Sequence, residues 1–128
     1  MSSETNRGPG YAKNPEHRVT VAPFEGRIVV EAQGQILVDT RRALVLREAS
    51  YPPVYYVPRA EANMDRLEKT AHHTYCPYKG EASYFRIAGL PNGDNAVWTY
   101  ETPYDEVVSI KDALAFYPDR VTIRAEPE

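Results

Sequence analysis

Residues 27–39 have the sequence RIVVEAQGQILVD, in which two apolar runs flank a glycine. The β-branched residues of these runs favour strands, because their side chains pack well on a pleated surface. Gly34 lies between the runs and supplies the positive φ that a short turn requires. The stretch therefore predicts a β-hairpin, and it makes β-sheet the first expectation for the rest of the chain.

The same signals continue in both directions from this hairpin. Short apolar or alternating runs, many of them closed by proline or glycine, predict further strands at residues 18–21, 41–47, 54–57, 82–88, 96–100, 115–117 and 121–123. Ten tyrosines and eleven prolines suit strands and turns better than helices. Short helices are expected only at residues 58–67 and 105–108, and residues 68–75 are ambiguous. We therefore expect a mainly β domain, a compact folded sheet or barrel-like arrangement of about eight or nine short strands with one or two short helices.

Length and composition limit the domain organisation and the partners. The 128 residues suit a single domain, and residues 1–15 are polar and aperiodic, so we expect a flexible N-terminal tail before one domain at residues 16–126. The first residues lack the apolar segment of a signal peptide, and no run has the length of a membrane helix. A net charge of −3 indicates no basic surface for duplex nucleic acid or anionic membranes. We expect a soluble cytoplasmic protein, monomeric or homodimeric, without nucleic-acid or membrane partners.

Reactive side chains concentrate in residues 72–80, HHTYCPYKG, where proline and glycine indicate a turn. Cys76 is the only cysteine, so no disulfide can form within the chain. Lys79 follows three residues later, and a nearby cation or histidine such as His73 favours the nucleophilic thiolate. These three residues are the candidate catalytic residues. The alternative is a buried, inert cysteine beside a solvated turn lysine.

The sequence indicates no metal and no cofactor. His73 and Cys76 have H-x-x-C spacing, but a structural zinc site needs four ligands and typically several cysteines. Lys79 and Gly80 resemble the end of a phosphate loop, although the preceding glycines and the following helix are missing.

Aromatic and charged residues elsewhere complete the candidate ligand-binding set. A tyrosine or tryptophan has an apolar body and a polar end, which suits a pocket wall as well as the rim of a core. Charged residues beside the predicted third and fourth strands either form a paired, partly buried arrangement or belong to a solvent face. The candidate ligand-binding residues are Tyr56, Tyr78, Trp98, Tyr100, Arg42 and Glu48.

Five motifs, taken together, resemble one known family. They are Val38-Asp39-Thr40-x-x-Ala43-Leu44, Pro53-Val54-Tyr55-Tyr56-Val57-Pro58, Thr74-x-Cys76-Pro77-Tyr78-Lys79-Gly80, Ala96-x-Trp98-x-Tyr100-x-x-Pro103 and Ala115-Phe116-Tyr117. Over residues 17–124 the chain resembles the family called domain of unknown function 427. The resemblance implies a compact β fold similar to the β-tent group, without the paired cysteines that bind zinc in many of its members. The family also carries a nucleotidyltransferase-like label, although the chain has no G-S motif followed by paired acidic ligands.

Three functions are compatible with these residues, and the sequence leaves open whether the protein is an enzyme. The first is a pocket around residues 76–80 that binds or transforms a small polar molecule, which requires the candidate residues to converge. The second is a non-catalytic interaction or homodimerisation module that uses a sheet edge near Tyr55 and Tyr56. The third is nucleotide transfer, which needs carboxylates around one metal ion; the candidates are Asp39, Glu48 and Asp105.

Overall fold

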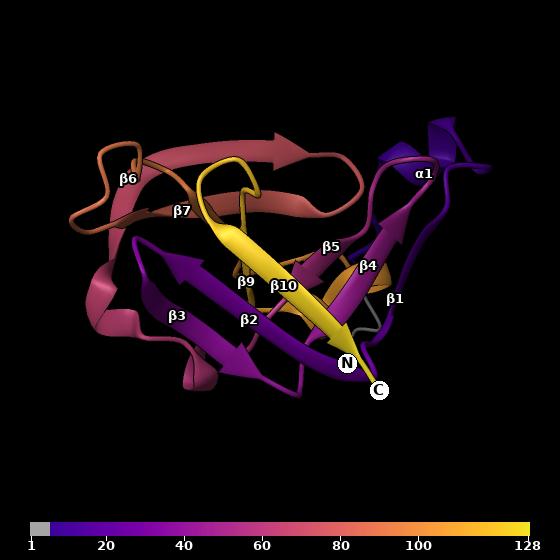
Figure 1. Cartoon of the computed structure of the whole chain (residues 1–128). Coiled ribbons are helices and arrows are strands. Elements are labelled where there is room, and N and C mark those ends of the chain that lie inside the picture. Colours follow the sequence, from indigo (N-terminus) through magenta and orange to yellow (C-terminus); the bar gives the residue numbers. More distant parts are fainter. Residues whose placement is uncertain (1–5) are drawn as a thin grey trace.

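The hairpin predicted at residues 27–39 is formed by β2 (Gly26–Ala32) and β3 (Gln35–Thr40) in the computed structural model, which describes residues 6–128 (Figure 1). Gln33 and Gly34 both have positive φ, 51° and 75°. Positive φ at both central residues is the geometry of a type I′ turn, whose twist matches that of the flanking strands. Gly34 therefore accounts for one of the two positive φ angles of the turn, whereas Gln33 adopts its positive φ without such a preference.

In the described residues, 6–128, antiparallel pairing arranges ten strands in three sheets. The first sheet, in the order β1-β4-β5, contains β1 (Val19–Pro23), β4 (Leu44–Glu48) and β5 (Val54–Tyr56). In the second, β10 (Thr122–Pro127) pairs with β2, so that the order is β10-β2-β3. The third, in the order β6-β7-β8-β9, contains β6 (Leu67–Cys76), β7 (Gly80–Ile87), β8 (Val97–Tyr100) and β9 (Leu114–Phe116).

The expectation of a mainly β domain is confirmed, with ten strands in place of eight or nine. The additional strand is β6, whose sequence was ambiguous because it is almost entirely polar. As an edge strand that pairs only with β7, it exposes most of its side chains to solvent. Such a strand needs no alternating apolar pattern. Within residues 6–128 the sheets form no closed barrel, and none of the helices has the length and apolar character needed to cross a bilayer.

Short helical turns replace the helix expected at residues 58–67. The structure has two 3₁₀ turns there, η1 (Arg59–Glu61) and η2 (Met64–Arg66), and Leu67 already belongs to β6. The backbone N–H of Asn63 donates to the carbonyl of Leu37 at 2.7 Å, and Ala62 forms an isolated bridge with Val38. These bonds to β3 use backbone groups that a continuous helix would pair internally. The helical turn expected after Pro103 is present as η3 (Asp105–Ile110).

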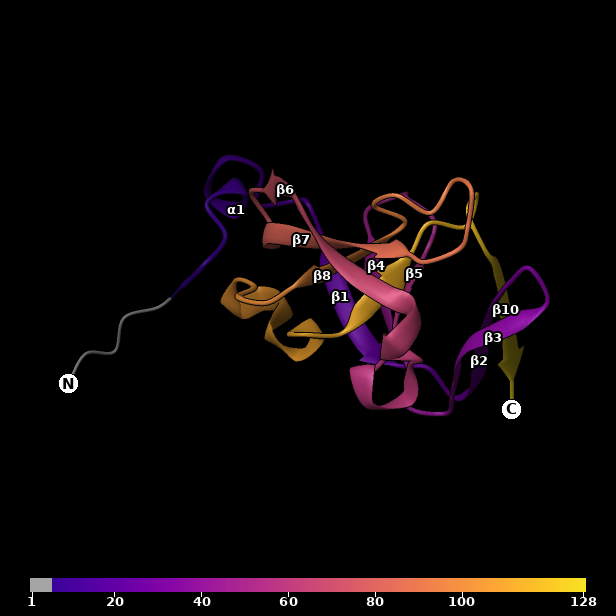
Figure 2. The same ribbon diagram turned by 90° about the vertical axis from the view of Figure 1, so that its left-hand side faces the viewer.

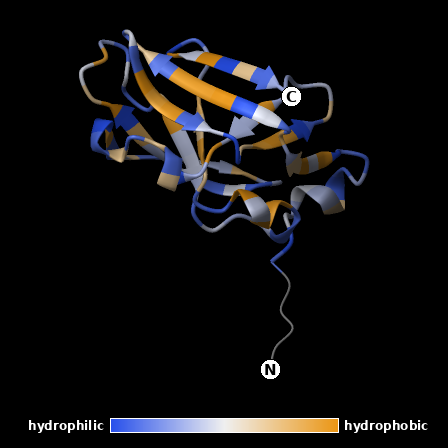
Figure 3. Cartoon of the chain, turned by 60° about the horizontal axis from the view of Figure 1, so that its bottom comes forward, coloured by the Kyte–Doolittle hydropathy of each residue, from blue (hydrophilic) through white to orange (hydrophobic). Residues whose placement is uncertain are grey.

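The four-stranded sheet lies between two apolar cores, and hydrophobic and hydrophilic residues alternate along several strands (Figure 3). Successive residues of β7 enter different cores: Phe85 packs toward the β10-β2-β3 sheet, and Tyr84 packs toward β4, β5 and η3. This follows from the two-residue period of a strand. The first core contains Ile28, Leu37, Val38, Phe85, Ile87, Val97 and Leu114; the second contains Leu46, Tyr56, Tyr84, Tyr100, Val107 and Ile110.

Residues 6–15, which belong to the flexible tail expected at residues 1–15, contact the domain. The short helix α1 (Gly10–Lys13) lies beside the β6–β7 hairpin, on the side of the molecule opposite the β10-β2-β3 sheet (Figure 2). Hydrogen bonds to the side chains of Asp105 and Glu106 hold the chain before it. Composition cannot indicate this contact because its partners are distant in sequence. Residues 1–5 of the expected tail lie outside the described residues.

Replacing Leu114 by alanine should lower the free energy of unfolding by about 2–5 kcal/mol, because this side chain is fully buried and its loss leaves a cavity. Urea unfolding followed by circular dichroism measures the change. Ile36→Ala is the control, since Ile36 is 50% exposed and should change the stability by less than about 1 kcal/mol. Equal losses in the two variants would contradict the placement of Leu114 in the core.

Candidate functional site

A charged cluster of three partly buried side chains lies at the end of β4. Glu48 is on the same side of β4 as Leu46, toward the second core. Its Oε1 accepts a hydrogen bond from Lys79 Nζ at 2.5 Å, and its Oε2 lies 2.8 Å from His17 Nε2. The three side chains are only 14–18% exposed. Because an ionised carboxylate can only accept hydrogen bonds, the imidazole donates from Nε2.

The pKa of Glu48 lies below its ordinary value. Burial opposes ionisation and would raise the pKa, but hydrogen bonds from Lys79 and then His17 lower it by more. Glu48 is therefore an anion at neutral pH, and each of its oxygens keeps a further lone pair for another donor.

The β6–β7 hairpin brings Lys79 to Glu48. Cys76 pairs with Gly80 across the hairpin, so that residues 77–79 form the connection. Gly80 has φ 113°, a conformation that side chains rarely adopt. The predicted turn is therefore present, and its Tyr78 ring stacks on His17 with the centroids 3.8 Å apart.

An aromatic pocket of about 590 Å³ lies next to the charged cluster, where residues from all three sheets meet. Its volume is within the range of small-molecule sites. Most of its lining is apolar, and Glu48 is the only carboxylate or cation among the lining residues. The pocket is lined by Glu48, Tyr51, Pro52, Pro53, Val54, Tyr55, Trp98, Phe116, Pro118 and Ile123.

Trp98 is held in one orientation at the wall of the aromatic pocket. Its Nε1–H donates to the hydroxyl of Tyr56 at 3.2 Å, and the two rings are perpendicular. The ring centroids of Tyr117 and Trp98 are 4.5 Å apart. Burial raises the pKa of Tyr117 to about 12, and burial also raises the pKa of Tyr56 and of Tyr100. These phenols are therefore neutral hydrogen-bonding groups at physiological pH.

Most of the predicted site residues converge. Glu48, Lys79 and Tyr78 belong to the charged cluster or contact it directly, and Trp98 joins Tyr56 at the pocket wall. Cys76 pairs with Gly80 at the base of the β6–β7 turn, and Tyr100 packs in the second core; neither lines the aromatic pocket. Cys76 is partly buried, whereas the alternative of an inert cysteine expects a fully buried one.

Arg42 and His73 lie elsewhere. Arg42 is exposed and its Nε donates to Glu61 at 3.0 Å, so it forms no pair with Glu48. His73 lies on the opposite face of β6, because the strand period turns it away from the face of Thr74 and Cys76.

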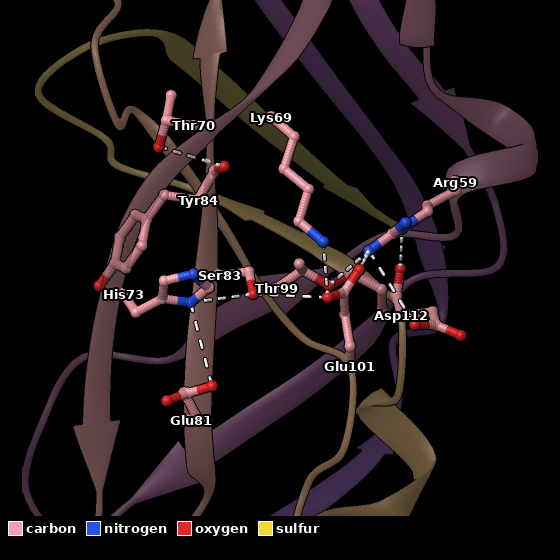
Figure 4. Close-up of polar contacts among 11 residues, drawn as sticks. Arg59, Lys69, Thr70, His73, Glu81, Ser83, Tyr84, Thr99, Glu101 and Asp112 are labelled. Atoms are coloured by element: carbon pink, nitrogen blue, oxygen red, sulfur yellow. Dashed lines mark hydrogen bonds and ion pairs between the residues drawn. The ribbon is translucent and has the colours of Figure 1, made fainter.

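Figure 4 shows the surroundings of His73, a hydrogen-bonded network on the face of the four-stranded sheet that also carries Phe85. Its Nδ1 is 3.4 Å from Ser83 Oγ and 4.0 Å from Glu81 Oε1. A catalytic serine triad uses both ring nitrogens, one for serine and the other for the carboxylate. Since both contacts here involve Nδ1, the arrangement is not such a triad. Ser83 and Lys69 both contact Glu101, which completes a structural network.

Sequence reasoning missed His17, Tyr51 and Tyr117. His17 precedes the first strand in a polar segment, and no local pattern distinguishes it from a solvated histidine. The two tyrosines lie in loops, where periodicity carries no information about which side chains face a pocket.

The three carboxylates considered for nucleotide transfer have different partners. Asp39 forms two hydrogen bonds with Arg27, at 2.8 and 2.7 Å. Asp105 accepts from the backbone N–H of Asn6, whereas Glu48 belongs to the charged cluster. Residues 6–128 contain no group of three or more His, Cys, Asp or Glu placed to hold a metal ion.

Fold and site together define a small mainly β domain with an aromatic pocket beside a partly buried ion pair. Residues 20–126 match the family described as Domain of unknown function (DUF427), and the chain belongs to that family. Among curated proteins, none matches the chain.

Stability should depend on Glu48 in acid. Because the folded-state pKa of Glu48 is below its ordinary value of 4.5, its contribution is present above that value and is lost as the pH falls through the lowered pKa. Urea unfolding between pH 6 and pH 3 should therefore show a smaller acid-induced loss in Glu48→Gln than in the native protein. The matched control is Glu16→Gln at an exposed position, which should keep the native pH dependence. Identical profiles for Glu48→Gln and native protein would contradict the lowered pKa.

Proposed function

We propose that the protein is a binding domain for a small molecule with a flat apolar ring and at least one N–H or O–H donor. The ring enters the aromatic pocket, and the donor bonds the carboxylate of Glu48. The observation that carries this proposal is that Glu48 belongs both to the pocket wall and to the charged cluster. The bound molecule would thus meet a large apolar surface and one fixed acceptor.

The physical chemistry of the pocket supports this ligand class. Aromatic rings and prolines offer a flat apolar ring both dispersion contacts and edge or face contacts with π systems. Glu48 accepts hydrogen bonds and, as an anion, repels acidic groups. Lys79 and His17 already occupy one position on each of its oxygens, which fixes the carboxylate plane before a ligand arrives. Preorganisation of this kind lowers the entropic cost of binding.

The other two functions receive less support. A nucleoside triphosphate needs cations or a metal ion around its phosphates, and the lining of the aromatic pocket contains neither arginine nor lysine. An interaction surface at β5 would need a free strand edge. Strand β5 is an edge strand of only three residues, and the next residue, Val57, already pairs with Leu114.

Binding can be tested with indole and benzimidazole, two rings that carry an N–H donor. Trp98 is the only tryptophan, so its fluorescence and its single indole Nε1–H resonance report the pocket directly. We expect a saturable shift of that resonance in the native protein. Naphthalene is similar in shape but has no donor. It should bind at least about tenfold more weakly, because it cannot form the hydrogen bond to the charged carboxylate.

Filling the pocket should abolish this response. Val54 lines the pocket, and Val54→Phe places extra volume there. Val108→Phe is the control, since Val108 is 58% exposed in η3 and does not line the pocket. Binding by Val54→Phe with native affinity would rule out this pocket as the site, provided that both variants keep the native circular dichroism spectrum.

A further inference from the structure

We propose that residues 8–17, which precede the family match at residues 20–126, are part of the ligand site, with His17 as the residue that positions Glu48. This inference rests on the proposed function, because it concerns the affinity of the same pocket. It assigns a role to a segment most of which composition alone indicates to be a flexible tail.

The segment is fastened to the turn that carries Lys79. The backbone N–H of Gly10 donates to the carbonyl of Pro77 at 3.0 Å, and Asn14 Nδ2 donates to the hydroxyl of Tyr78 at 3.1 Å. The ring of Tyr11 packs edge-on against Tyr78 with the centroids 5.0 Å apart. The segment therefore contacts the same two hairpin residues, Pro77 and Tyr78, through its backbone, an amide side chain and an aromatic ring.

The contact at Gly10 is too close for any side chain. A Cβ at this position would lie 2.6 Å from Cε1 of the Tyr78 ring. Gly10 is buried although its neighbours at residues 12–16 are exposed. A glycine at the point of close approach is the residue type that such a contact requires.

A second attachment holds the beginning of the segment. The N–H of Gly8 donates to Glu106 Oε1 at 2.9 Å, and Arg7 pairs with the other oxygen of Glu106 at 3.4 Å. Glu106 belongs to η3, which packs against the second core through Val107 and Ile110. The segment is thus attached at both ends, to η3 and to the β6–β7 hairpin.

His17 connects the attached segment to Glu48. One face of its imidazole lies on Tyr78, with an angle of 16° between the rings, while Nε2 bonds Oε2 of Glu48. Lys79 bonds only Oε1. A carboxylate bonded at one oxygen can rotate about its side-chain torsions, whereas bonds at both oxygens fix its plane. His17 therefore determines how the free lone pairs of Glu48 face the aromatic pocket.

Two substitutions separate the two contacts of His17. His17→Phe keeps a ring over Tyr78 but removes the N–H that bonds Glu48, and His17→Gln keeps an N–H donor but removes the ring. His72→Phe is the control, because His72 is exposed, lies outside the charged cluster and contacts Tyr84 with its ring.

The first readout is the affinity for indole, measured on the Trp98 Nε1–H resonance. We expect His17→Phe to bind about tenfold more weakly than native protein, whereas His17→Gln and His72→Phe stay within about threefold. Native affinity in His17→Phe would overturn the positioning role. Equal losses in His17→Phe and His17→Gln would also overturn it, since they would indicate a purely structural contribution.

The second readout is independent of any ligand and keeps the two proposals apart. The ¹³C resonance of the Glu48 carboxyl, followed against pH, should give a higher pKa for Glu48 in His17→Phe than in the native protein and should return toward the native value in His17→Gln. An unchanged pKa of Glu48 in His17→Phe would overturn the inference even if indole binds. Failure of the native protein to bind indole together with a raised pKa would overturn the proposed function and confirm the link between His17 and Glu48.

Discussion

Two backbone hydrogen bonds between Val57 and Leu114, each 2.8 Å long, join the β1-β4-β5 sheet to β9 of the four-stranded sheet. Val57 immediately follows β5, and Leu114 is the first residue of β9. The two bonds therefore make one continuous surface of two sheets whose strands are distant in the sequence. Tyr56 is adjacent to this junction and is buried against Trp98. Together with the second core, to which both sheets contribute, the junction holds the wall of the aromatic pocket beside the end of β4 that carries Glu48. The site is therefore a consequence of sheet assembly.

The charged cluster is costly unless it is completely paired. Removing a carboxylate and an ammonium group from water costs several kcal/mol for each ion, and only good geometry and additional hydrogen bonds offset this. Here Glu48 receives an ion pair and a hydrogen bond from Lys79 and a further hydrogen bond from His17. A well-packed apolar trio would stabilise a small β domain at least as well. Ionisable groups with shifted pKa values cluster at functional sites, and the lowered pKa of Glu48 beside an apolar pocket agrees with the proposed binding site.

Local sequence predicted most of the strands because each depends on residues that are neighbours in the chain. The turn at Gln33 and Gly34 and the apolar runs around it are examples, since φ preference and β-branching are properties of single residues. The exceptions also have physical reasons. Strand β6 is polar because it is an edge, and the helix expected at residues 58–67 is broken because Asn63 bonds Leu37 on β3. In both cases a partner distant in sequence decided the local conformation.

The candidate site divides in the same way. Residue types and the Pro and Gly of the turn led to Lys79, Tyr78, Trp98 and Glu48 as candidates, because a loop held by a rigid sheet often presents functional side chains; the structure places Lys79 and Trp98 near Glu48. Only the tertiary structure decided that His73 faces the other side of β6 and that His17 completes the cluster. Strand register sets the side of β6 on which His73 lies. The position of His17 depends on its contact with Glu48, 31 positions away in the chain. Sequence alone thus determined the strands, the turns and the chemistry available; long-range packing determined which of those groups meet, because side chains distant in the chain become neighbours only when the sheets assemble.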